Sequence, residues 1–156
     1  MPSEPGPSFY ELTPAECRFV LARHSFGRLA YTFHDRVDVE PISYVLSGNA
    51  LVFRTAPGSK LVTLAHHRWA ALEVDEADGP LDWCSVVAHG AVYVLREDAG
   101  EAGARAYRSA LRALRRLNPR ALRPGDPTPF RTVVAKLHID HLTGRAASSH
   151  AGAITF

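Results

Sequence analysis

Six short stretches of alternating or uniformly apolar residues, joined by short turns, constrain the fold of this chain more than any other feature. They lie at 27–33, 37–46, 50–55, 69–74, 83–95 and 132–139. A period of two residues is typical of a β-strand, whose side chains point alternately to opposite faces. The connections His34-Asp35-Arg36 and Ser47-Gly48-Asn49 are too short for a crossover helix, so the strands they join are expected to be antiparallel neighbours.

Three helices are expected beside these strands, over about 13–24, 59–66 and 97–117. The first begins at a capping box, in which the side chains of Thr13 and Glu16 accept from each other's backbone N–H groups. Ser59 is expected to cap the second helix. Because strands outnumber crossover helices, the pattern disfavours a doubly wound parallel sheet. It favours an antiparallel barrel or sandwich with helices at its edges, which is an α+β fold.

The length of 156 residues predicts a single domain over residues 1–156. Residues 1–8 hold three prolines and one glycine, so we expect a flexible lead-in. The tail over 146–156 is rich in alanine, serine and glycine, and we expect it to be loosely packed.

The charge balance gives no reason to expect a polyanionic partner. Eighteen Lys and Arg against sixteen Asp and Glu leave a net charge of +2, so no nucleic-acid partner is expected. No stretch approaches ~18 uninterrupted apolar residues, so no membrane partner is expected either. Cys17 and Cys84 stand far apart and outside any CxxC pair, which predicts buried thiols, no zinc site and a cytoplasmic location.

The segment 53–60 has the composition of a phosphate site. A strand ends in Arg54 and Thr55, turns through glycine, and opens a helix with Ser59 and Lys60. A helix N-terminus offers free N–H groups and partial positive charge, and the two cations add charge-assisted hydrogen bonds. The alternative is a hairpin exit with a capped helix and two solvated cations.

Five segments follow one another in the order and spacing of a known family. They are Gly27-Arg28-Leu29-Ala30, Val39-Glu40-Pro41-Ile42-Ser43-Tyr44-Val45, the run 51–61, Ala71-Leu72-Glu73-Val74-Asp75 and the run 83–91. On these segments the chain resembles the pyridoxamine 5'-phosphate oxidase-like FMN-binding split barrels, in particular the small bacterial branch containing the 5-nitroimidazole reductases. The resemblance implies an antiparallel six-stranded split β-barrel with flanking helices, FMN as the cofactor, and a homodimer with the flavin at the subunit contact.

The resemblance also implies which residues contact the cofactor. The FMN phosphate would be held by Arg54, Thr55, Ser59 and Lys60, and the isoalloxazine would lie along the backbone of Pro41, Ile42 and Ser43. Tyr44 and Trp83 would lie near the ring or across the subunit contact, and core packing is the alternative for both. A strand edge offers a donor and acceptors in one plane, and Pro41, which lacks an N–H group, suits an edge strand.

The function that follows from the resemblance is FMN-dependent oxidation or reduction of a small molecule, with a nitroaromatic or quinone-like acceptor suggested by the family. The flavin does the redox chemistry and the protein positions it, so no catalytic side chain is assigned. A non-enzymatic module that binds flavin, deazaflavin or haem is the alternative.

A metal site is a second alternative. His138 and Asp140 form an HxD pair whose side chains would share one face of a strand, as in the iron sites built from two histidines and a carboxylate. With a third ligand, such a pair would make the protein a metal-dependent oxygenase. Surface or satisfied histidines near the barrel end are the simpler explanation of the pair, and we assign no metal.

Overall fold

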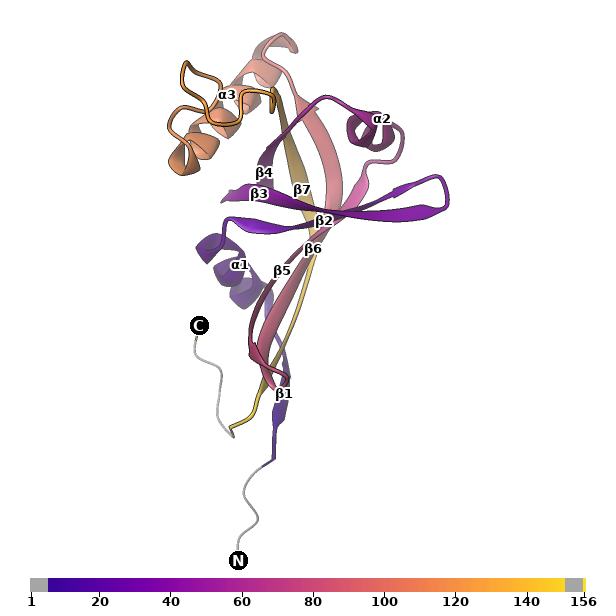
Figure 1. The fold of residues 1–156 in the computed structure, drawn as a ribbon, viewed down its shortest axis with the longest axis vertical. Coiled ribbons are helices and arrows are strands. Elements are labelled where there is room, and N and C mark those ends of the chain that lie inside the picture. The colour runs from indigo at the N-terminus through magenta and orange to yellow at the C-terminus, as the bar shows by residue number, and fades with distance from the viewer. Residues whose placement is uncertain (1–5, 151–155) are drawn as a thin grey trace, which may run out of the picture.

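A computed structural model describes residues 6–150 and residue 156 of the chain. Its elements, drawn in Figure 1, follow in chain order as β1 (Ser8–Glu11), α1 (Pro14–Arg23), β2 (Phe26–Phe33), β3 (Arg36–Ser47), β4 (Ala50–Thr55), α2 (Ser59–His66), β5 (Trp69–Gly79), β6 (Asp82–Leu95), α3 (Gly100–Leu117) and β7 (Val133–Ser148).

The strands form a closed antiparallel ring. Their order is β7-β4-β3-β2-β5-β6, and β6 pairs with β7 to close the barrel, while β1 pairs with the far end of β7. Closure depends on the length of β7, which pairs with β4 over Val133–His138 and with β6 over Val134–Ala147. The predicted α+β fold with an antiparallel six-stranded barrel is therefore confirmed, and the sandwich alternative is excluded.

The barrel is split between β3 and β4. Residues 36–43 of β3 pair with β2, whereas residues 44–47 pair with β4. Beyond Tyr44 and Phe53 the two strands separate, so residues 36–43 have a strand partner on one side only within the described part of the chain. This open edge lies below α2 in Figure 1.

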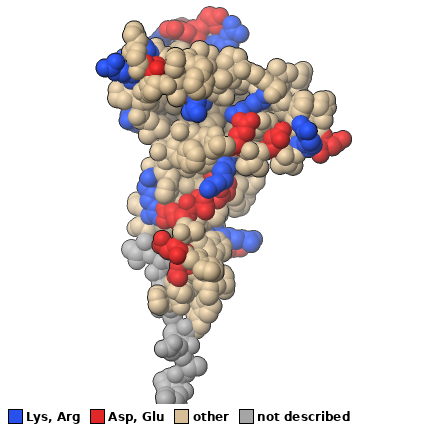
Figure 2. Space-filling view, in the orientation of Figure 1, with Lys and Arg blue, Asp and Glu red and all other residues tan. Residues whose placement is uncertain are grey.

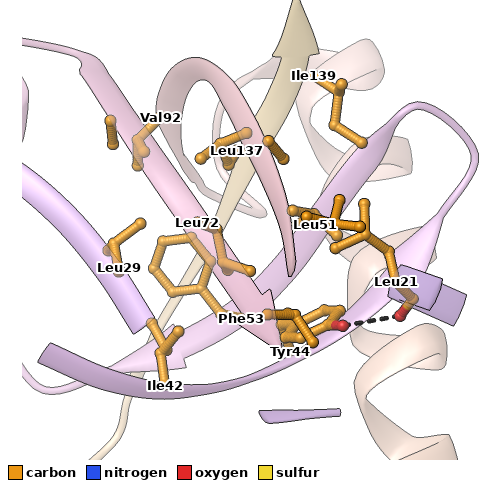
Figure 3. Close-up of a cluster of buried hydrophobic side chains, with 14 of the residues drawn as sticks. Leu21, Leu29, Ile42, Tyr44, Leu51, Phe53, Leu72, Val92, Leu137 and Ile139 are labelled. Carbon is orange, nitrogen blue, oxygen red and sulfur yellow. Dashed lines mark hydrogen bonds between the residues drawn. The ribbon is translucent and has the colours of Figure 1, made fainter. Parts of the chain in front are cut away.

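The core fills the barrel with the inward-facing residues of the alternating strands, as Figure 3 shows. Tyr44 and Phe53 are opposite each other in the β3–β4 register, and both are fully buried. Helix α1 packs against this core through Cys17, Val20 and Leu21. The Tyr44 hydroxyl donates to the carbonyl of Leu21 at 2.7 Å, which satisfies the one polar group of the ring.

The predicted first helix and its cap are confirmed. Glu16 N–H donates to Thr13 Oγ1 at 3.2 Å, and Thr13 N–H donates to Glu16 Oε2 at 2.7 Å. The predicted cap of α2 is wrong: Gly58 occupies the N-cap position without a side-chain hydrogen bond, and Ser59 is the first helical residue. The carbonyl of Ser59 accepts from the Thr63 hydroxyl at 2.9 Å.

Helix α3 covers the outer face of the barrel beside the split. Ala110 and Leu114 pack against Val52 of β4 and Val134 of β7, forming a second small core outside the barrel. The segment 118–132 then leads from α3 into β7. Figure 1 shows this segment folded back against α3 at the upper end of the molecule.

Several element boundaries differ from the sequence predictions, and α3 begins at Gly100 rather than at 97. Strand β5 continues to Gly79, so the turn lies at Pro80 and Leu81 rather than at 77–80. Ser8, assigned to the lead-in, pairs with Ser148 as the first residue of β1. Strand β7 continues to Ser148, nine residues past the predicted end at Ile139.

The prediction of a loosely packed tail over 146–156 is therefore wrong for its first residues. Ala146 and Ala147 are 1% and 2% exposed, and they lie in β7. Their small side chains allow close packing where β7 lies between β1 and β6. The rest of the two terminal predictions, over residues 1–5 and 151–155, lies outside the described residues.

The surface carries charges of both signs, and the two thiols are placed as the sequence predicts. Figure 2 shows Lys and Arg interspersed with Asp and Glu on the face in view. Cys17 and Cys84 are free and buried, as predicted. In the part of the chain that the structure describes, no helix combines the length and apolar character needed to span a membrane.

Candidate functional site

Four side chains meet beneath the start of α2, and we call them the Lys60 cluster: Tyr31, Glu40, Thr55 and Lys60. The Lys60 ammonium forms an ion pair with Glu40 Oε2 and lies 3.5 Å from Thr55 Oγ1. The Tyr31 hydroxyl donates to the other carboxylate oxygen, Glu40 Oε1, at 2.7 Å. Strands β2, β3 and β4 and helix α2 each contribute one member, so the cluster forms only when the barrel does.

Lys60 is not the solvated cation that the alternative interpretation of segment 53–60 assumes. Its side chain is 14% exposed and that of Glu40 is 40% exposed. Partial burial raises the pKa of Glu40, but the hydrogen bonds from Lys60 and Tyr31 outweigh it and leave that pKa below its usual value. Burial and the nearby Glu40 carboxylate raise the pKa of Tyr31, which therefore remains a hydrogen-bond donor.

The start of α2 offers further donors beside the Lys60 cluster. The first helical hydrogen bonds run from Leu61 and Val62 to the carbonyl of Gly58, so the N–H groups of Ser59 and Lys60 precede them. The Ser59 side chain is exposed, and a Cβ added to Gly58 would meet no atom within 4 Å. Hydroxyl and backbone donors thus border open space beside the Lys60 cluster, an arrangement that fits a phosphate group.

Arg54 does not join this group, although the sequence places it with Thr55, Ser59 and Lys60. Successive residues of β4 point to opposite faces, so Arg54 lies on the outer face with Val52, while Thr55 lies on the side of Phe53. The Arg54 guanidinium donates to Asp126 Oδ2 at 2.6 Å and to the carbonyl of Arg131 at 2.9 Å. Its side chain is 7% exposed. The expected convergence of all four residues is wrong for Arg54.

Sequence reasoning missed Asp126, which organises the segment after α3. Besides Arg54, its carboxylate accepts from the backbone N–H groups of Leu122 at 2.9 Å and Thr128 at 3.0 Å, and from Asn118 Nδ2 at 3.1 Å. Hydrogen bonds from Arg54 hold the pKa of Asp126 well below its usual range. The one signal in the sequence is Arg54 itself, because an arginine that is buried after apolar strand residues needs an acceptor.

A cavity of about 440 Å³ lies beside this ion pair, between the split and α3. Leu114, Leu117 and Pro127 supply apolar walls, and Ser43 and Arg131 supply polar ones. Its size and its mixed lining suit a small organic molecule.

The open edge of β3 lies next to this cavity. Within the described residues it presents unpaired backbone donor and acceptor groups, as the sequence predicts. Tyr44 N–H donates to the carbonyl of Ser25 at 2.9 Å, so the backbone of Tyr44 faces β2. Backbone direction alternates along an antiparallel strand, so Ile42 faces β2 as well, whereas Pro41 and Ser43 face the open edge. Pro41 thus costs the ladder no hydrogen bond. Ser43 N–H and the carbonyls of Pro41 and Ser43 form a planar donor and acceptor set.

Tyr44 and Trp83 lie apart from this edge. The Tyr44 side chain is fully buried in the core, so the core-packing alternative is confirmed and ring contact by its side chain is not supported. Trp83 lies near the opposite end of the barrel, in register with Ala77 and Ala147, and its Nε1 donates to the carbonyl of Pro80 at 3.2 Å. Within one chain it is not near the Lys60 cluster.

The metal alternative gains no support from the described residues. His138 and Asp140 are both exposed on β7, but no group of three His, Cys, Asp or Glu side chains within residues 6–150 and 156 is arranged to hold a metal ion. His89 and His141 face each other across β6 and β7 with ring centroids 6.3 Å apart, without a third ligand among the described residues.

Comparison with known proteins identifies the family. A family model described as pyridoxamine 5'-phosphate oxidase matches residues 13–146. Protein RA0666 of Rhizobium meliloti (strain 1021), described as uncharacterized, is 31% identical over 140 residues, which cover 85% of this chain and 91% of that protein.

Solved structures share the fold. A FAD-binding protein from Mesorhizobium loti has a TM-score of 0.71 and 26% identity, with 90% of this chain and 99% of that chain covered. A Bacteroides thetaiotaomicron protein, proposed as a 5-nitroimidazole antibiotic resistance protein, has a TM-score of 0.67 at 16% identity, with 92% and 90% covered. Together with the matched family model, these likenesses confirm the resemblance stated from the sequence, and the chain belongs to the pyridoxamine 5'-phosphate oxidase-like family.

Proposed function

We propose that the protein is an FMN-dependent oxidoreductase that acts on a small molecule, with a nitroaromatic or quinone-like compound as the acceptor. The observation that carries the proposal is the meeting of Lys60 and Thr55 at the start of α2, beside the open edge of β3. A flavin phosphate would bind to Thr55, Ser59 and Lys60, and the isoalloxazine would lie along Pro41, Ile42 and Ser43.

The choice among cofactors is part of the proposal. The Mesorhizobium loti relative is described as FAD-binding, which supports a flavin in this chain but does not select FMN. Ser59 is exposed and the space at Gly58 is open, so the site would accept a terminal phosphate or one that continues to an adenosine group. Mass spectrometry of the cofactor released from the purified protein distinguishes FMN, FAD and deazaflavin.

The chain's own residues would position the reactants. When bound, the flavin supplies the hydride or electron transfer. Ser43 lies on both the open edge and the 440 Å³ cavity, so a substrate in that cavity would lie next to the ring. Leu114 and Leu117 would contact the apolar parts of such a substrate.

Removal of the Lys60 ammonium tests the phosphate site. A charge-assisted hydrogen bond contributes about 1.5–3 kcal/mol, or roughly 10- to 150-fold in Kd. We expect Lys60→Ala to weaken FMN binding by this factor and to leave the weak binding of riboflavin, which lacks the phosphate, unchanged. Isothermal titration of both proteins with both ligands gives a double cycle that isolates the phosphate contact.

The control is Lys136→Ala, because Lys136 lies on β7 in register with Val52 and Tyr93, away from the Lys60 cluster. It should bind both ligands as the wild type does. Equal weakening of FMN and riboflavin by Lys60→Ala, or no weakening of either, would contradict the phosphate site.

A non-enzymatic flavin-binding module is the competing function, since placement of a flavin needs no catalytic side chain. Steady-state oxidation of NADH and NADPH with a panel of nitroaromatic and quinone acceptors separates the two. Absence of turnover with every pair, in protein that is saturated with flavin, would favour the module.

A further inference from the structure

We propose that Glu40 is an internal counter-anion for Lys60. In the flavin-free protein the Glu40 carboxylate pairs with the Lys60 ammonium and so opposes the binding of the flavin phosphate. The inference rests on the proposed function, because it requires Lys60 to be a phosphate ligand. It adds a residue that sets how tightly the site holds an anion.

The geometry of the Lys60 cluster carries the inference. The ammonium group that the start of α2 would offer to an anion is turned toward the barrel end, where it pairs with Glu40 Oε2 and approaches Thr55 Oγ1 at 3.5 Å. Ser59 beside it is exposed, whereas the Lys60 side chain is only 14% exposed. The cation is therefore already neutralised by a group of the same protein.

A phosphate at the start of α2 would meet this carboxylate as a like charge. Two anions that share one cation at hydrogen-bond distance repel each other, and each weakens the other's binding. Either Glu40 leaves Lys60 when phosphate binds, or it stays and repels the phosphate. In both cases the negative charge of Glu40 lowers the affinity for the phosphate.

The hydrogen bond from Tyr31 allows Glu40 to release Lys60. Its hydroxyl donates to Glu40 Oε1 at 2.7 Å, so the carboxylate keeps one partner after the ammonium moves. Tyr31 is 6% exposed and fixed in the barrel wall, opposite Asp38 and Ala70 in the registers of β2 with β3 and β5. The carboxylate therefore has a fixed donor in both states of Lys60.

The consequence is that a weakly bound anion loses more occupancy than a tightly bound one. A small anion gains only its contacts with Lys60 and the start of α2, and it must displace Glu40 for them. A flavin nucleotide gains contacts along the open edge of β3 as well, which offset that cost. Glu40 thus lowers the occupancy of the site by inorganic phosphate more than it limits occupancy by the flavin.

The experiment compares wild type with Glu40→Gln in the full chain. Glutamine keeps the size and the acceptor for Tyr31 but removes the charge. We expect the Kd of FMN to fall roughly tenfold, the size of one charge-assisted contact, with the Kd of riboflavin unchanged. The Kd of inorganic phosphate, measured by titration of the flavin-free protein, should also fall roughly tenfold in the variant.

Two further variants serve as controls. Glu76→Gln makes the same change of net charge at a carboxylate that pairs with Arg23 and His24, and it should bind FMN as wild type does. Glu40→Asp keeps the charge, so the Kd of FMN should stay close to that of wild type even if the fold is less stable.

The outcomes separate the inference from the proposed function. If wild type prefers FMN to riboflavin but Glu40→Gln binds FMN no more tightly, the competition is absent and only the inference is overturned. The same holds if both flavins tighten equally. If wild type binds the two flavins equally well, or binds neither, the phosphate site itself is overturned and the inference with it.

Discussion

At the scale of single residues, the ion pair of Arg54 and Asp126 ties the segment after α3 to β4. The two side chains are 7% and 3% exposed, and the carboxylate also accepts from Asn118, Leu122 and Thr128. Removal of either charge leaves the other buried and unpaired, which is strongly destabilising. We therefore assign Arg54 to holding the cavity wall in place rather than to binding phosphate.

The pH dependence of stability tests this assignment. A carboxyl whose pKa is lower in the folded than in the unfolded state stabilises the fold at every pH above its unfolded pKa of about 3.9. That contribution is lost as the pH falls from the unfolded pKa toward the folded pKa. We expect Asp126→Asn to lower the thermal midpoint at pH 7 and to lose less stability than wild type between about pH 5 and pH 2.

Asp98→Asn is the matched control, since Asp98 pairs with Arg96 where both side chains are about 70% exposed. A surface pair contributes little to stability, so its curve should run close to that of wild type. If the curves of Asp126→Asn and wild type stay parallel from pH 7 to pH 2, Asp126 does not hold the segment through its charge.

Single residues could be predicted from the sequence where their partners are local. The capping box of Thr13 and Glu16 spans three positions, and both partners are visible at once in the sequence. Arg54 and Asp126 are 72 positions apart, and Lys60 and Glu40 are 20 apart on different elements. Only the folded barrel brings such pairs together, so neither counter-ion could be assigned from the sequence.

At the scale of elements, β7 shows why small residues were misinterpreted. A Cβ added to Gly144 would lie 2.7 Å from Cys17 Sγ and 2.9 Å from Leu12 Cβ, so glycine allows β7 to pass beneath α1. From composition alone, a segment rich in glycine and alanine near a terminus is predicted to be loosely packed. Here the pairing with β1 and β6 overrides that tendency, because those partners lie far away in sequence.

We expect Gly144→Ala to destabilise the fold by about 1–3 kcal/mol, the usual cost of overpacking a filled core. Urea unfolding followed by fluorescence measures the change. Gly79→Ala, at a position where an added Cβ meets nothing within 4 Å, should stay within about 0.5 kcal/mol of wild type. Equal stability of the two variants would contradict close packing of β7 against α1.

At the scale of the whole molecule, the ring of strands leaves an apolar patch on its outer surface. Val37 and Val39 of β3 are 70% and 60% exposed, and Trp69 of β5 is 58% exposed. Thr32 lies opposite Val37 in the register of β2 and β3. Val37, Trp69 and Thr32 line one shallow hollow with Ala71. Contiguous exposed apolar surface of this kind marks an interaction site.

The occupant we propose is a second copy of the chain, which places a flavin at the subunit contact. The patch continues along β3 from Val37 and Val39 to the open edge at Pro41 and Ser43, where the isoalloxazine would lie with one side uncovered by its own barrel. A two-fold contact would cover that side and create two equal sites.

The dimer can be tested together with the flavin. Val37→Arg places a charge in the patch, so we expect light scattering at micromolar concentration to show a dimer for wild type and a monomer for the variant. Because the second side of the ring would then face water, FMN should also bind more weakly to the variant. Phe130→Arg, at a side chain that is 60% exposed in the segment after α3, should remain dimeric. A wild-type monomer that is saturated with FMN at the same concentration would show that the barrel completes its flavin site alone.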